Sequence, residues 1–141
     1  MKGEIERYSK ALEGDGFVHV KSLMEGNDLS LLQSAIKANQ DNPSPFSTVI
    51  QSSGGGEFFM DFNNWRRLEL IEPVCSHPKI VDLVTVLAKS RQCWLFHDHV
   101  LVKSGDAPAT PVHHDRPYFI FKGDLNLSVW MTTDDVPRNS S

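Results

Sequence analysis

A histidine and a carboxylate stand two positions apart in residues 110–118, which read TPVHHDRPY. In an extended chain successive side chains alternate between two faces, so His113 and Asp115 are expected to point the same way and His114 to point away. Two histidines and one carboxylate on one face of the metal form the protein ligands of many non-haem iron centres. The spacing therefore predicts two of three such ligands, although most histidines and aspartates near a turn are simply exposed or locally hydrogen-bonded.

Helical patterns occupy much of the chain before this pair. Apolar residues recur at helical spacing in residues 5–12, and again in residues 29–39, where Asp28 is the expected N-cap. Pro78 fits the first position of a third helix, whose apolar stripe extends the prediction to residue 90. We expect all three helices to be packing elements.

Two further segments are assigned from their composition. Residues 17–20 follow a glycine-rich break and read as a short strand. Residues 41–56 are rich in Pro, Ser and Gly and are expected to form a mobile loop that acts as a lid or connector. The run Gly54-Gly55-Gly56 is not a phosphate-binding motif, because no Gly-Lys-Ser/Thr follows it.

Residues 93–103 change to a period of two, which predicts a strand. Its even positions are apolar except for Asp98, and its odd positions include His97 and His99. We expect the even face to be the interior, where Asp98 must be paired, hydrogen-bonded or protonated because an isolated buried charge is costly. Asp98 then either supports the site or takes a buried arginine or a strand-end hydrogen bond. With the faces reversed, the two histidines become the candidate ligands.

Length and composition limit the remaining classes. The 141 residues, 40% of them hydrophobic, suit a single domain, 1–141. A formal net charge of −4, with no basic cluster longer than Arg66 and Arg67, argues against nucleic-acid binding. Cys75 and Cys93 lack the number and spacing of a disulfide framework or a zinc site, which favours reduced thiols in the cytoplasm. We expect no membrane association, since no apolar run approaches the roughly 20 residues of a membrane span.

Several spaced elements resemble the phytanoyl-CoA dioxygenase family of Fe(II)- and 2-oxoglutarate-dependent oxygenases. They are FHDHVLVK, a short Pro-containing loop, the His-x-Asp pair with Tyr118 three residues after its aspartate, and SVW leading to DDVP. The segments DGFVHV and FFMDFNNWRR extend the likeness towards the N-terminus. It covers nearly the whole chain and lacks only the family's C-terminal part.

The resemblance implies an α+β fold with N-terminal helices and an incomplete double-stranded β-helix, a jelly roll of the cupin type. It implies Fe(II) bound by His113 and Asp115, 2-oxoglutarate as co-substrate, ascorbate as reductant and a small-molecule substrate whose identity stays open. By the same correspondence Asp98, Tyr118 and Trp130 would line the co-substrate pocket, although Trp130 would equally suit a core position.

In the family, a second histidine and an arginine that pairs with 2-oxoglutarate lie beyond the point where this chain ends. Arg116 alternates away from the His-x-Asp face and is a poor substitute. We therefore expect a fragment or truncated dioxygenase that lacks its C-terminal strands, has little activity alone and self-associates through unpaired sheet edges. Two alternatives stay open: a non-catalytic small-molecule or metal-binding module with half of the fold, and a small α+β protein with an accidental His-x-Asp.

Overall fold

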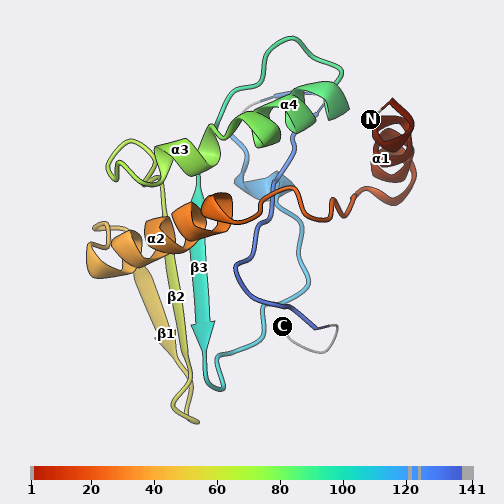
Figure 1. Ribbon diagram of the computed structural model, residues 1–141. Coiled ribbons are helices and arrows are strands. Elements are labelled where there is room, and N and C mark those ends of the chain that lie inside the picture. Colours follow the sequence, from red (N-terminus) through yellow and green to blue (C-terminus); the bar gives the residue numbers. More distant parts are fainter. Residues whose placement is uncertain (1, 121, 124, 138–141) are drawn as a thin grey trace.

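A three-stranded antiparallel sheet with helices packed on one of its faces forms the centre of the molecule (Figure 1). The computed structural model describes residues 2–120, 122–123 and 125–137. The expected α+β class is confirmed. In chain order the elements are α1 (Lys2–Asp15), α2 (Asn27–Asp41), β1 (Thr48–Gln51), β2 (Glu57–Phe62), α3 (Glu72–Cys75), α4 (Pro78–Leu87), β3 (His99–Ser104) and a 3-10 turn (Arg116–Tyr118).

The core lies between α2, α3 and one face of the sheet. Phe59 pairs with Val102 across the β2–β3 ladder, and Asp61 pairs with Val100, so these residues share one face. That face packs against Leu32 of α2 and Val74 of α3, both buried. The opposite face is also apolar but largely uncovered, with three large side chains between 37% and 48% exposed: Ile50, Phe62 and Leu101.

The helices predicted from periodicity are present as α1, α2 and α4. Pro78 is the first residue of α4, as expected, and the helix ends at Leu87 rather than at residue 90. The predicted cap of α2 is wrong, because the N-cap is Gly26 and the helix begins at Asn27, two residues earlier than a cap at Asp28 would place it. Asp28 instead lies in the first turn, where its carboxylate contacts His77 Nε2 at 3.2 Å and Lys79 Nζ at 2.7 Å. It thereby links the start of α2 to the start of α4.

The loop expected over residues 41–56 contains a strand that composition concealed. Thr48–Gln51 pairs with Glu57–Phe62 as β1, and the three glycines make the turn of this hairpin. Gly55 has φ +83°, a left-handed conformation that glycine adopts at no steric cost. The run of Thr, Val and Ile was the missed strand signal.

Two predicted strands are wrong in whole or in part. Residues 17–20 are irregular, and Phe17 is 70% exposed without a neighbouring strand. Of residues 93–103 only those from His99 onward lie in β3 (His99–Ser104), because β2 ends at the residue paired with His99 and leaves the preceding segment without a ladder. Asp98 and Val100 are buried as expected, whereas Trp94, on the same predicted face, is 87% exposed.

After β3 the chain turns back towards the N-terminal end of that strand, where the 3-10 turn lies (Figure 1). The strands that the resemblance implies around the His-x-Asp pair and at residues 128–130 are irregular here. The finer expectation of a jelly roll therefore has no counterpart among the strands of the described residues. Within the same residues, no helix is both long and apolar enough to cross a bilayer.

Candidate functional site

The His-x-Asp pair lies on an irregular segment that leads into the 3-10 turn. His113 Nε2 lies 3.5 Å from Asp115 Oδ1, and both side chains are about half exposed. Strand alternation therefore does not bring these two side chains together. The pair lies on irregular backbone just before the 3-10 turn, and Tyr118 closes that turn by donating its N–H to the Asp115 carbonyl at 2.9 Å.

Each member of the pair is oriented by a second hydrogen bond. His113 Nδ1 lies 2.7 Å from the Pro111 carbonyl. Because a carbonyl oxygen only accepts, Nδ1 carries the proton in this contact, and in the neutral ring Nε2 would present a lone pair. Asp115 Oδ2 accepts a hydrogen bond of 3.0 Å from the Ser128 hydroxyl, the first residue of the SVW motif. With a neutral imidazole, the facing atoms Nε2 and Oδ1 would thus be two lone-pair donors for one ion.

This geometry fits two positions around one metal ion. With bonds of about 2.0–2.2 Å, two adjacent ligand atoms lie roughly 2.8–3.6 Å apart, and the observed 3.5 Å is within that range. No group of three or more metal-binding side chains occurs among the described residues. The donor chemistry of His113 and Asp115 fits a divalent metal, and this part of the chain leaves the third protein ligand unassigned.

The other two candidate histidines form a contact of their own. The rings of His97 and His99 meet edge to face with centroids 5.1 Å apart, and His97 also contacts Phe96. Burial lowers the pKa of His99, the neighbouring His97 lowers it further, and Asp98 and Asp115 oppose the shift. His97 and His99 do not converge with His113 into a three-donor group within the described residues.

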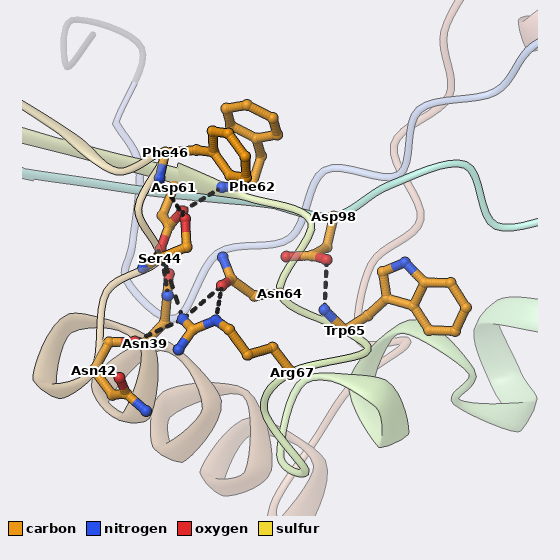
Figure 2. A network of polar contacts seen from close by, with 10 residues as sticks. All are labelled: Asn39, Asn42, Ser44, Phe46, Asp61, Phe62, Asn64, Trp65, Arg67 and Asp98. Atoms are coloured by element: carbon orange, nitrogen blue, oxygen red, sulfur yellow. Dashed lines mark hydrogen bonds and ion pairs between the residues drawn. The ribbon is translucent and has the colours of Figure 1, made fainter.

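Asp98 is buried and anchors the segment that follows β2 (Figure 2). Its Oδ1 accepts the N–H of Trp65 at 2.8 Å, and its backbone carbonyl accepts the N–H of Asn63 at 3.1 Å. This is the strand-end hydrogen bond that the sequence left open as one role for this residue. The second carboxylate oxygen, Oδ2, is buried without a hydrogen-bond partner among the described residues.

The remaining residues expected in the pocket are exposed. Tyr118 is 69% and Trp130 71% exposed, so Trp130 does not fill a core position. Arg116 donates to the Gly123 carbonyl at 3.3 Å, in a contact separate from that of Asp115 with Ser128. The described structure does not gather Asp98, Tyr118 and Trp130 around the metal-ligand pair by any direct bond.

A second carboxylate, Asp61, is completely buried and lies at the centre of a polar network (Figure 2). It accepts hydrogen bonds from the Ser44 hydroxyl at 2.5 Å, the Ser44 N–H at 2.8 Å and Asn39 Nδ2 at 2.8 Å. Burial raises the pKa of Asp61, but hydrogen bonds from Ser44 and Asn39 outweigh this and lower it to about 2. Sequence reasoning missed this residue, although a lone carboxylate on the interior face of a strand was its signal.

Arg67 completes that network from the segment after β2. Its guanidinium donates to Asn64 Oδ1 and to the Asn42 carbonyl, both at 2.6 Å, and lies 3.9 Å from Asp61. Asn64 is fully buried. These contacts join the end of α2, the loop before β1 and the segment after β2 into one unit.

Lys103 is a further polar residue that the sequence reasoning did not single out. Its Nζ is buried, has no hydrogen-bond acceptor among the described residues, and lies 4.9 Å from the centre of the Phe58 ring. Lys103 lies on the same face of β3 as His99. A buried ammonium group without an acceptor favours an anionic ligand or solvent nearby.

Comparison with known proteins identified no relative. No protein-family model matches the chain, and searches of curated proteins and of solved structures found no significant similarity.

Proposed function

We propose that this chain carries the His-x-Asp part of the iron site of a 2-oxoglutarate-dependent dioxygenase of the phytanoyl-CoA dioxygenase type. One observation carries the proposal: His113 Nε2 and Asp115 Oδ1 face each other at 3.5 Å while their other polar atoms are engaged by Pro111 and Ser128. Outer contacts of this kind hold metal ligands in place and set the histidine tautomer.

In this proposal the protein's residues bind and orient, and the cofactors supply the oxidation. His113 would hold Fe(II) through Nε2 and Asp115 through Oδ1, with the Pro111 carbonyl retaining the proton on Nδ1. When bound, iron and 2-oxoglutarate together supply the oxidation of an unactivated C–H bond in a small molecule, with ascorbate as reductant. Since both ligands must be deprotonated, metal affinity should fall as the pH is lowered.

The position of Lys103 favours an acidic co-substrate. Among the described residues its ammonium lacks an acceptor, and it lies on the same sheet face as His99, four residues further along β3. A carboxylate such as those of 2-oxoglutarate would satisfy that ammonium. Asp98, Tyr118 and Trp130 are proposed for the pocket on the family resemblance, with Asp98 acting through the segment that it anchors.

The test is the affinity for Mn(II), which replaces Fe(II) without air oxidation, measured by calorimetry and electron paramagnetic resonance. We expect His113→Ala and Asp115→Ala to weaken binding at least tenfold, because each removes a ligand. His114→Ala is the matched control, since it removes an exposed neighbouring imidazole, and His97→Ala is a second control. Equal binding by the wild type and all four variants would contradict the assignment.

A non-catalytic metal-binding module is the second candidate, favoured by the finding that the described residues bring together two donors and not three. Succinate formation from 2-oxoglutarate, with Fe(II), ascorbate and oxygen present, separates the two. We expect little turnover from this chain alone, because misplacing reacting groups by about 1 Å can cost on the order of a hundredfold in rate. Metal binding without succinate in any longer form of the protein would favour the binding module.

A further inference from the structure

A hollow of about 320 Å³ opens on the surface beside the segment that Asp98 anchors. Its volume is at the lower end of the range for small-molecule sites, roughly 300–1,000 Å³. The walls combine apolar surface with polar groups. The lining residues are Asn63, Trp65, Arg66, Leu95 and Phe96.

Arg66 is the charged group of this hollow. Its guanidinium carbon lies 4.5 Å from the centre of the Trp65 ring, a cation–π contact that limits the motion of the side chain. Stacking on a ring face leaves the N–H edges of a guanidinium free, and these edges match two oxygens of a carboxylate or phosphate. The next residue, Arg67, differs because its N–H groups are taken by Asn64 and Asn42.

The backbone beneath the hollow is held in place from inside the protein. The Asn63 N–H and the Trp65 N–H both donate to the buried Asp98, through its carbonyl and its carboxylate. Asn63 has φ +62°, in the left-handed region that asparagine adopts more readily than most residues. Figure 2 shows the Trp65 indole directed away from the Asp61 network, on the far side of that anchor. The rim is therefore formed before any ligand arrives.

The apolar wall continues towards the metal-ligand pair. The Phe96 ring meets the Phe119 ring edge to face with centroids 6.0 Å apart. Phe119 directly follows the 3-10 turn that begins after Asp115. A molecule whose charged end sits at Arg66 would thus extend its body along Phe96 in the direction of the proposed iron site.

We propose that this hollow binds small molecules with an anionic head group on an aromatic or branched apolar body. Arg66 pairs with the anion, and Leu95 and Phe96 contact the body. Only the description of the ligand as a substrate rests on the proposed function, because binding itself needs no iron. The head group is a carboxylate or a phosphate, which present the same oxygen geometry to a guanidinium.

The experiment titrates the whole chain, without metal and in EDTA, with three probes: 3-phenylpropanoate, phenyl phosphate and the uncharged 3-phenylpropanamide. Binding is followed by nuclear magnetic resonance at the Trp65 indole N–H. We expect the better anion to bind at least tenfold more tightly than the amide, and the tighter of the two anions identifies the head group. Equal binding of the amide and both anions would overturn the proposal.

Variants locate the effect. Arg66→Ala should remove the preference for anions, and Arg66→Lys should retain part of it because the charge remains while the two-pronged geometry is lost. Arg91→Ala is the matched control: it removes an exposed arginine that does not line the hollow. An unchanged preference in Arg66→Ala, or an equal loss in Arg91→Ala, would overturn the assignment. Chemical shifts of the core amides verify that each variant is folded.

Measuring anion binding and Mn(II) binding on the same protein samples tests this inference and the proposed function independently. If the anions fail to bind while Mn(II) still depends on His113 and Asp115, the hollow is not a ligand site and the metal assignment stands. If Mn(II) binding fails while the anions still require Arg66, the iron site falls and the hollow remains a binding site.

Discussion

Asp61 and Asp115 are the same residue type in opposite surroundings. Asp61 is fully buried and its carboxylate accepts from Ser44, Asn39 and the Phe62 N–H, so its hydrogen-bonding capacity is used within the fold. Asp115 is half exposed and, among the described residues, its side chain takes one hydrogen bond, from Ser128. A carboxylate whose partners are all internal stabilises structure, whereas one with a free oxygen beside an oriented imidazole is available to a ligand. The number of internal partners, and not the residue type, distinguishes the two roles.

The largest expected effect is on stability at Asp61. Asp61→Ala removes the acceptor of several buried donors, and breaking a buried charged network typically costs about 3–5 kcal/mol of unfolding free energy. Asp115→Ala, at a half-exposed site, should change that free energy by no more than about 0.5 kcal/mol. Urea unfolding followed by circular dichroism measures both. Similar losses for the two variants would remove the distinction drawn between these carboxylates.

Acid should reveal the same difference through Asp61. Its folded-state pKa of about 2 lies below the ordinary 3.8, so its contribution is present above pH 4 and is lost as the pH falls from about 4 to 2. The shift corresponds to about 2 kcal/mol of stability. In the Asp61→Asn variant, the free energy of unfolding measured in urea should no longer fall by this amount between about pH 4 and pH 2. An identical decline in wild type and variant over that range would show that Asp61 titrates normally.

The smallest expected effect concerns the contact that orients Asp115. Ser128→Ala should weaken Mn(II) binding about tenfold, as loss of an outer contact to a metal ligand commonly does, and should leave the unfolding free energy nearly unchanged. Thr133→Ala is a suitable control, because the Thr133 hydroxyl contacts Asp134 and not the metal-ligand pair. A normal Mn(II) affinity in Ser128→Ala would mean that the 3.0 Å contact does not orient Asp115.

The sequence predicts the helices better than the strands. The repeats behind α1, α2 and α4 are local, so periodicity alone finds these helices. Strands depend on a partner: residues 93–98 alternate as well as His99–Ser104 do, but only the latter lie opposite β2. In the same way β1 was hidden in a segment whose Pro, Ser and Gly content predicts a loop, and only its pairing with β2 makes it a strand.

The candidate site was predictable in its residue types and not in its support. The spacing of His113 and Asp115 indicated that they would lie together, and they do so on irregular backbone rather than on an alternating strand. The contacts from Pro111 and Ser128 depend on folding of an irregular segment, which no periodicity describes. Asp61 was overlooked because its donors, Asn39 and Ser44, are distant in the sequence and unremarkable in type.

The three consecutive glycines in the hairpin turn between β1 and β2 differ in their tolerance to substitution. At Gly54 a methyl group would meet the movable carboxylate of Asp106, which can give way. At Gly55 there is space but a left-handed backbone, which suits asparagine or aspartate better than alanine. At Gly56 any side chain would overlap the backbone of Asp106 and Ala107, where the chain leaves β3 on its way to His113. A single added carbon atom at Gly56 would therefore have to displace the backbone of the segment that connects β3 to His113.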